Sequence, residues 1–396
     1  MIKIDYSNCT ACGACKQVCP SGCISIEADI EGFLYPVIDV GNCIECGACE
    51  AVCPINKDLS INDLLKQPIA YAAIDRNIQN LLKSTSGGIF GCIAEYILTL
   101  GGSVYGCSFN EKNEAIHIRI ANSDQLDCLR GSKYVQSNTR QTFKEVKKDL
   151  NNGLFVLFSG TPCQIAGLKS FIGDSCSLFT VDLVCHGVGS QAYFNKWIKY
   201  LENKNNAIIT ELNFRSKKTQ GWLLEGDYTF KPNGKFQELR RRTLAYFENY
   251  YYFYFLRGDI YRESCYCCNY ATINRVGDFT LGDFWGVERL DLNIDVHLGC
   301  SMVLVNTERA KILIEKLPIQ KQEVPILKAI EKNGQLSHPS KFSVVRKELL
   351  KEFREVSGAQ IQKNFIKNNW KAIVFAKCKQ ILPRKIKQFV IKVLDV

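Results

Sequence analysis

The sequence contains no long apolar run. Its aromatic stretch at residues 244–256 is short and is interrupted by Glu248 and Asn249, whereas a helix that crosses a bilayer needs roughly 18 apolar residues. Residues 1–8 hold no apolar stretch of signal-peptide length, and Cys9 follows at once. We therefore expect a soluble or peripheral protein of a reducing, cytoplasmic compartment, where clustered thiols bind metals and do not form a disulfide framework.

Cysteine is the compositional outlier, with 20 copies among 396 residues. The length predicts about two to three domains, and the apolar share of 46% is enough for a sizeable core. The net charge of +10 is unevenly spread: residues 1–66 carry four Lys against nine acids (−5), and residues 341–396 carry fourteen Lys and Arg against four acids (+10). We therefore expect different partners at the two ends.

A cysteine motif, C-x2-C-x2-C-x3-C-P, occurs twice, 34 positions apart. The two copies comprise Cys9, Cys12, Cys15 and Cys19, then Cys43, Cys46, Cys49 and Cys53. Three thiolates at this spacing can wrap three irons of one cubane, and the fourth faces the other cluster. The motif thus predicts two 4Fe–4S clusters, one bound by Cys9, Cys12, Cys15 and Cys53 and the other by Cys43, Cys46, Cys49 and Cys19.

Other residues of this segment fit the same interpretation. Gly13 and Gly47 let the backbone approach the inorganic sulfides. Zinc is the alternative, but its sites favour two separated C-x2-C pairs. Cys23 lies outside both motifs and is expected to be a plain thiol. The two motifs therefore predict an α+β ferredoxin-like dicluster domain over residues 1–59. Its two close clusters would conduct electrons, and the domain itself would transform no substrate.

The middle of the chain has the pattern of an α/β domain. Residues 60–68 are polar and end in Pro68, which indicates a linker. Beyond them strand and helix patterns alternate, which predicts mainly parallel strands in a domain over residues 69–340. The expected strands are 103–109, 116–120, 154–158 and 178–184, and the expected helices are 88–100, 139–150, one that starts at Pro162 with Thr161 as N-cap, and one capped by Ser190.

Cysteines recur in the loops of this domain. Cys163 and Cys185 follow strands at their carboxyl ends, where ligands of such sheets bind, and Cys265 and Cys268 form a compact group. Four soft ligands from three segments could close a third cubane. The residues alone equally allow Cys163 and Cys185 to be small buried side chains, with zinc bound by the later group.

Two small-residue segments suit an anion. Residues 84–88 read Ser-Thr-Ser-Gly-Gly and open a helix, so their amides could cradle a pyrophosphate, although a plain turn would look the same. Residues 131–134 add Lys133 and Tyr134, which could serve the same anion or a flavin ring, or could lie at the surface. The stripe at 250–255 is expected to be core.

Six motifs in this order resemble the coenzyme F-420 hydrogenase/dehydrogenase beta subunit family, in a form with a dicluster ferredoxin before the flavin domain. They are Ser-Thr-Ser-Gly-Gly (84–88), Gly-Ser-Lys-Tyr (131–134), Gly-Thr-Pro-Cys-Gln (160–164), Asp-Leu-Val-Cys-His-Gly (182–187), Cys-x2-Cys (265–268) and Gly-Asp-Phe-Trp-Gly (282–286). The resemblance covers roughly residues 1–310 and implies an α/β domain that binds FAD and a third 4Fe–4S cluster. A hydride donates two electrons at once, whereas a 4Fe–4S cluster accepts one electron at a time. A flavin can accept the pair and then donate the electrons singly.

The resemblance also implies site residues. The FAD phosphates would meet the segment containing Ser84, Ser86, Gly87 and Gly88, with help from Lys133. His186 and Asp283 would make polar contacts near the flavin, although His186 could equally be a satisfied buried histidine. Cys163, Cys185, Cys265 and Cys268 would bind the third cluster.

Residues 341–396 are expected to form a basic helical tail. Residues 363–396 hold nine basic residues and one acid, and apolar residues at 386, 389, 390, 393 and 394 follow helical spacing, as does an earlier face around Trp370. This pattern is typical of an interfacial helix on an anionic membrane, and the alternative is a helix packed on the main domain. Nucleic-acid binding is not expected, because no reader motif accompanies the charge.

The leading hypothesis is an iron–sulfur flavoprotein oxidoreductase. It would pass electrons between a deazaflavin or related hydride-type substrate, FAD and the clusters. Its expected binding partner is a redox protein or the deazaflavin-type substrate itself. Two other functions remain open: a non-catalytic electron-transfer subunit, and a peripheral membrane reductase in cell-surface polysaccharide biosynthesis.

Overall fold

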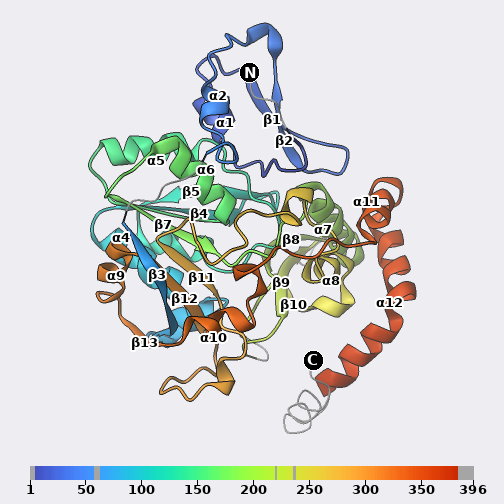
Figure 1. Ribbon diagram of the computed structural model, residues 1–396. Coiled ribbons are helices and arrows are strands. Elements are labelled where there is room, and N and C mark those ends of the chain that lie inside the picture. The colour runs from blue at the N-terminus through green and yellow to red at the C-terminus, as the bar shows by residue number, and fades with distance from the viewer. Residues whose placement is uncertain (1–4, 58–62, 219–220, 235–237, 382–396) are drawn as a thin grey trace.

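Eight strands form the central sheet of the protein, which a computed structural model describes for residues 5–57, 63–218, 221–234 and 238–381, with side chains up to residue 377. The strand order is β13-β3-β12-β11-β7-β6-β4-β5 (Figure 1). In chain order the strands are β3 (Leu64–Asp75), β4 (Ser103–Phe109), β5 (Ala115–Ile120), β6 (Val156–Gly160), β7 (Leu178–Leu183), β11 (Phe279–Asp283), β12 (Ser301–Thr307) and β13 (Ile319–Glu323). The four middle strands, β4, β6, β7 and β11, are parallel.

The prediction of mainly parallel strands is wrong for the two flanks of the sheet, which are antiparallel. β5 pairs with β4 through a hairpin, and β12, β3 and β13 are each antiparallel to their neighbours. The predicted linker at 60–68 is also wrong from residue 64 onward, because β3 begins at Leu64. Pro68 lies where the pairing of β3 with β12 shifts register, and a residue without a backbone N–H fits such a bulge. The predicted strands at 103–109, 116–120, 154–158 and 178–184 are confirmed to within two residues.

Helices cover both faces of the sheet. α4 (Ile89–Thr99) and α9 (Glu308–Ile314) pack on one face, and α5 (Thr142–Asn151), α6 (Pro162–Ile172) and α10 (Ile326–Glu331) pack on the other. β6 shows how the sequence achieves this, because Leu157 faces the first layer while Val156 and Phe158 face the second. α3 (Ile78–Lys83) precedes the segment at 84–88.

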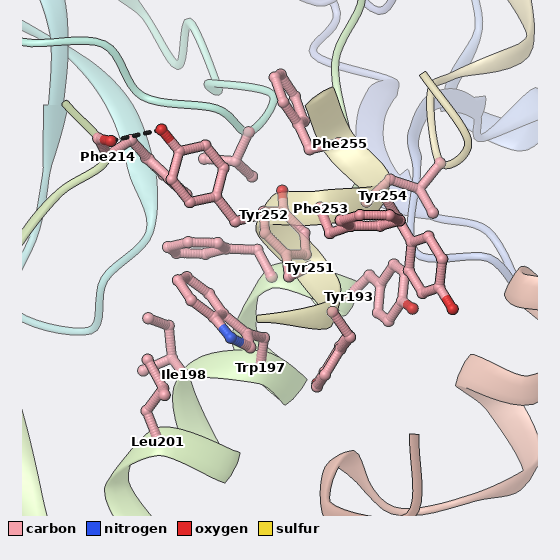
Figure 2. Packing of buried hydrophobic residues seen from close by; sticks show 14 of the residues in the cluster. Tyr193, Trp197, Ile198, Leu201, Phe214, Tyr251, Tyr252, Phe253, Tyr254 and Phe255 are labelled. Atoms are coloured by element: carbon pink, nitrogen blue, oxygen red, sulfur yellow. Dashed lines mark hydrogen bonds between the residues drawn. The ribbon is translucent and has the colours of Figure 1, made fainter. Parts of the chain in front are cut away.

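An aromatic subdomain lies beside the sheet (Figure 1). It contains the antiparallel strands β8 (Ala207–Asn213), β9 (Glu225–Pro232) and β10 (Arg240–Ala245) with helices α7 (Gln191–Asn205), α8 (Tyr250–Leu256), α11 (Arg346–Glu355) and α12 (Gly358–Ile381). Figure 2 shows α8 packed on α7, with Tyr251 stacked on Trp197 at 5.4 Å and the Tyr252 hydroxyl donating to the Phe214 carbonyl. All six residues at 250–255 are buried, which confirms that they are core.

The two cysteine motifs form a small unit at one end of the molecule (Figure 1). It consists of α1 (Ala14–Val18), the hairpin of β1 (Ile24–Ala28) and β2 (Leu34–Ile38), and α2 (Ala48–Ala51). Gly13 and Gly47 start the two helices with positive φ values of 85° and 72°, a backbone shape that favours glycine. The unit is attached to α5 and α6: Gln17 Oε1 accepts from the Phe143 amide at 2.8 Å, and Ser170 Oγ donates to the Val52 carbonyl at 2.7 Å.

α12 runs along the outer edge of the aromatic subdomain (Figure 1). Its inner face, at Ile361 and Phe365, belongs to the aromatic core. The structure describes no helix that is long and apolar enough to cross a membrane. The amphipathic pattern expected at 386–394 lies outside the described residues.

Candidate functional site

A cavity of about 510 Å³ opens where three parallel strands end. β6, β7 and β11 end at Gly160, Leu183 and Asp283, and all three residues lie on the cavity wall. The carboxyl ends of parallel strands meet at one edge of a sheet, so the loops that follow them share this space.

Four cysteines from three segments line the cavity: Cys163, Cys185, Cys265 and Cys268. All four are free thiols. Burial raises the pKa of Cys185, Cys265 and Cys268, and the neighbouring thiols, Cys163 among them, raise each further. The four sulfur atoms therefore face a common space, and together they can ionise only against a strong positive charge.

The start of α6 fixes Cys163 in this group. Thr161 caps the helix and Pro162 is its first residue, as predicted. The cap is reciprocal, because the Thr161 side chain accepts from the Gln164 amide and Gln164 Oε1 accepts from the Thr161 amide at 3.0 Å. Thr161 Oγ1 also lies 3.1 Å from Cys163 Sγ. The backbone around the thiol is thus held before any ligand binds.

The donor set of this quartet fits an iron–sulfur cluster. Four soft thiols converge there. Burial raises the pKa of Cys163 and Cys265, and the positive charge of the buried Arg262 guanidinium opposes this rise. Among the described residues, no three His, Cys, Asp or Glu side chains are arranged to hold a single metal ion.

The segment at 84–88 lies on the same cavity. Ser84, Ser86 and Gly88 are on its wall, and Gly88 caps α4 with a φ of 85°. Gly87 packs behind the wall: its amide donates to Ser301 Oγ at 2.9 Å, and a Cβ there would lie 2.2 Å from the Ala73 carbonyl oxygen. Gly87 therefore shapes the loop, and its amide is already occupied.

Lys133 also lies on the cavity wall. Its Nζ donates to the carbonyls of Arg130 and Cys128 at 2.7 and 3.2 Å, and burial lowers its pKa. The neighbouring Ser132 amide donates to Thr85 Oγ1 at 3.1 Å. The loops at 84–88 and 131–134 are thus joined, and both present polar groups to one space.

Asp283 belongs to a polar and aromatic group that the sequence did not reveal. Arg215 Nη1 donates to Asp283 Oδ2 at 2.8 Å, and Trp222 Nε1 donates to Oδ1 at 3.1 Å. The Arg215 guanidinium lies 5.3 Å from the ring of Trp285, which stacks on Trp222. Arg215 Nη2 is buried and has no hydrogen-bond acceptor among the residues that the structure describes.

Two histidines line the cavity in different ways. His186 is exposed there, not buried, and its carbonyl accepts from Ser340 Oγ. His117 is buried: its Nε2 donates to the Ser159 carbonyl at 3.0 Å, so Nδ1 accepts from Ser137 Oγ at 3.1 Å. Burial lowers the pKa of His117 to about 4.

The small unit brings together cysteines from both motifs. Burial raises the pKa of Cys9 and Cys15, and the thiol of Cys53 raises both further. Cys19 lines a second, small cavity with Cys43, Cys46 and Cys49. The structure thus places the fourth cysteine of each motif beside the first three of the other.

Two family models match the chain. Residues 8–57 match the 4Fe-4S dicluster domain, and residues 155–331 match the C terminus of the coenzyme F420 hydrogenase/dehydrogenase beta subunit. Residues 155–331, less than half of the chain, are thus similar to the C-terminal domain of the F420 hydrogenase/dehydrogenase beta subunit, and residues 8–57 in front of them are similar to a 4Fe–4S dicluster domain.

Comparisons with whole proteins add less. Among curated proteins there is no match. Among solved structures 13 chains match, including one of the F420-reducing NiFe hydrogenase complex from Methanosarcina barkeri. That chain is 16% identical, the match covers 80% of this chain and 93% of that one, and the TM-score is 0.41. A likeness this distant carries no argument here.

Sequence reasoning missed several residues of the site, above all Arg215, His117 and Arg262. Arg215 follows β8, far along the chain from the strand ends, and His117 sits in an ordinary alternating strand. Arg262 is three residues before Cys265, and that spacing was the available signal.

Proposed function

We propose that the protein is an iron–sulfur flavoprotein oxidoreductase, with FAD in the central cavity and a third 4Fe–4S cluster on Cys163, Cys185, Cys265 and Cys268. The observation that carries the proposal is the convergence of these four thiols on the cavity wall that also contains Ser84, Thr85, Ser86 and Gly88. A flavin bound there would take the electron pair of a hydride and release the electrons singly to the clusters.

The charge of the wall supports an anionic dinucleotide. Four cationic side chains line the cavity, Arg130, Lys133, Arg215 and Arg262, against the single acid Asp283. Arg130 reaches the segment at 84–88, because its Nη1 donates to Ser84 Oγ at 3.2 Å. A pyrophosphate placed beside Ser86 and Gly88 would also meet the start of α4, where the helix dipole favours negative charge.

The order of the clusters follows from the same contacts. α6 carries Cys163 at its start and packs on Cys12 of the dicluster domain at Gly167. Burial raises the pKa of Tyr270, and the thiols of Cys163 and Cys12 raise it further, so this ring lies near both groups. We infer that electrons pass from the cavity to the third cluster, then to the cluster of Cys9, Cys12, Cys15 and Cys53, and last to the other, or in reverse.

Anaerobic purification with iron, acid-labile sulfide and flavin assays tests the proposal. We expect about twelve irons and about one FAD per chain. Cys185→Ala should remove about four irons, whereas Cys107→Ala, a thiol on the same cavity wall outside the quartet, should remove none. About eight irons without flavin would instead identify a non-catalytic electron-transfer subunit.

The substrate we propose is a reduced deazaflavin or a related hydride donor, which is the chemistry named in the matching family model. In an anaerobic cuvette, reduced coenzyme F420 should bleach the bound flavin, and NADH at the same concentration should not. Bleaching by NADH alone would assign a nicotinamide and contradict the proposal.

A membrane-associated reductase, such as one of cell-surface polysaccharide biosynthesis, is the second candidate, and α12 favours it. Ile366, Trp370 and Val374 are spaced by four residues and are each about half exposed, at 50%, 56% and 50%. Lys363, Lys367 and Lys371 lie on the same exposed side of the helix. Apolar residues between lysines complement anionic lipid headgroups, and tryptophan favours the interface.

Liposome co-sedimentation tests this candidate. The full chain should bind vesicles with phosphatidylglycerol more tightly than vesicles of phosphatidylcholine alone, and binding should weaken in high salt. Ile366→Ala/Trp370→Ala should reduce binding several-fold, whereas Leu327→Ala, which removes a still more exposed apolar side chain on α10, should not. Equal binding of both variants would reject the membrane candidate.

A further inference from the structure

Cys23 is not part of either cysteine motif, yet it lies among the cysteines of the second cluster. Its side chain is 8% exposed, and its Sγ lies 3.4 Å from Cys19 Sγ. It lines the small cavity that also receives Cys19, Cys43, Cys46 and Cys49. Five thiols, not four, therefore face this space.

Local geometry brings Cys23 back to Cys19. Cys19 ends α1, and Gly22 has a φ of 68°, so the chain turns sharply between the two cysteines. The Cys23 carbonyl then accepts from the Asp39 amide at 2.8 Å, next to the pairing of Ile24 in β1 with Ile38 in β2. The hairpin holds the backbone of Cys23, while its thiol remains in contact with that of Cys19.

The internal repeat supplies a comparison within the same chain. Thirty-four residues after Cys23 stands Lys57, so a lysine follows the second motif where this thiol follows the first. The cluster of Cys9, Cys12, Cys15 and Cys53 has no cysteine at this repeat position. Any property that Cys23 gives to a cluster should therefore be confined to the second cluster.

We propose that Cys23 is an alternative fourth ligand of the second cluster, able to replace Cys19 on its iron. In the exchange the bond between iron and Cys19 Sγ breaks and a bond between the same iron and Cys23 Sγ forms. The proton of the Cys23 thiol passes to Cys19 Sγ, so neither the charge nor the oxidation state of the cluster changes. The proposal depends on the dicluster domain and not on the third cluster or the flavin.

Contact between the two sulfur atoms makes this exchange possible. The proton can pass directly from Cys23 Sγ to Cys19 Sγ, which are 3.4 Å apart. Rotation about the Cα–Cβ bond of Cys23 moves its sulfur without moving the hairpin. The second cluster would then keep four thiolate ligands when Cys19 is lost or oxidised. The first cluster, without such a thiol, would open to a three-iron form when Cys53 is lost.

Three variants test the proposal by iron content and EPR of the anaerobically purified full chain. Cys19→Ala should keep the iron content of the wild type and two 4Fe–4S signals in the dicluster domain. Cys53→Ala and Cys19→Ala/Cys23→Ala should each lose about one to four irons, with a three-iron signal or the loss of one cluster. The proposal fails if Cys19→Ala loses as much iron as Cys53→Ala.

A second measurement avoids the loss of a motif cysteine. Cys23→Ala keeps all eight motif residues, so the protein should fold and contain all its iron. On titration with ferricyanide the variant should release iron from the second cluster several-fold faster than the wild type, while the first cluster behaves alike in both. Equal rates of release would overturn the proposal even if the Cys19 variants do not fold.

Discussion

Gly167 on α6 lies directly against Cys12 of the dicluster domain. A Cβ at position 167 would be 2.8 Å from both Cβ and Sγ of Cys12, which is closer than real Cβ atoms approach. Gly167 is also one helical turn after Cys163, so a single turn of helix links the quartet in the cavity to Cys12 of the dicluster domain.

We predict that bulk at position 167 separates the two parts of the molecule. Gly167→Ala and Gly167→Val should weaken the magnetic coupling and slow electron transfer between the proposed third cluster and the cluster of Cys9, Cys12, Cys15 and Cys53, with the larger effect for valine. Neither change removes a ligand, so iron content should stay constant. Freeze-quench EPR after flavin reduction measures the transfer.

Ser170→Ala is the control for the two Gly167 variants. It lies on the same helix and loses the bond to the Val52 carbonyl, at a cost of about 1 kcal/mol, but adds no atoms. The magnetic coupling between the clusters in Ser170→Ala should equal that in the wild type. If Gly167→Val transfers electrons as fast as the wild type, contact through α6 is not the route.

Arg262 holds the dicluster domain from the other side and is 1% exposed. Its guanidinium donates to the carbonyls of Cys9 and Leu34, each at 2.8 Å, and to Gln136 Oε1 at 3.0 Å, and it lies 4.0 Å from the ring of Tyr35. Among the described residues it forms no ion pair with a carboxylate, so its charge is available to a reduced cluster.

Arg262→Gln should make the adjacent clusters harder to reduce, because a buried positive charge favours the more negative, reduced state. A unit charge about 10 Å away, at an effective dielectric constant of about 20, corresponds to roughly 70 mV. EPR redox titration measures the shift. Arg257→Gln removes the same charge from an exposed site five residues earlier, so its potentials should stay within about 20 mV of the wild type.

The contrast between these residues shows what the sequence could and could not predict. The ligands of the dicluster domain follow from spacing, because bonds to a cubane tie Cys9, Cys12 and Cys15 to fixed separations. The parallel middle of the sheet likewise follows from local patterns. Arg262 and Gly167 act through contacts between segments far apart in the chain, and no periodicity marks such contacts.

The antiparallel flanks were missed for a similar reason. β3 runs to twelve residues and contains Lys66, Gln67 and Pro68, which locally resemble a linker. Pairing with β12 and β13 on either side satisfies its backbone, and that pairing depends on strands more than two hundred residues away.

His117 should make stability depend on pH. Burial lowers the pKa of its folded form to about 4 from an ordinary value of 6.5. Between these values the unfolded chain binds a proton that the folded chain does not, so stability should fall as pH decreases from about 6.5 to 4, by roughly 3 kcal/mol.

Urea unfolding of the anaerobic protein at several pH values measures this dependence. His117→Gln keeps a donor toward the Ser159 carbonyl and should flatten the profile in that window, whereas His297→Asn, at an exposed position, should leave it as in the wild type. An unchanged slope in His117→Gln would show that other groups titrate there.

The ion pair of Asp283 and Arg215 tests whether the polar end of the cavity is a structural or a ligand-binding element. Their side chains are 13% and 2% exposed, so Asp283→Asn leaves a buried guanidinium without its counter-charge. The expected loss is about 3 kcal/mol of unfolding free energy, whereas Glu331→Gln in the exposed pair with Lys328 should cost far less.

The double variant Asp283→Leu/Arg215→Met separates the two roles. Because apolar replacement of both partners removes the unpaired charge, the double variant should recover most of the lost stability. If Arg215 Nη2, which is buried without an acceptor, binds the cofactor, the recovered protein should still retain several-fold less flavin than the wild type. Stability and flavin content that recover together would make the pair purely structural.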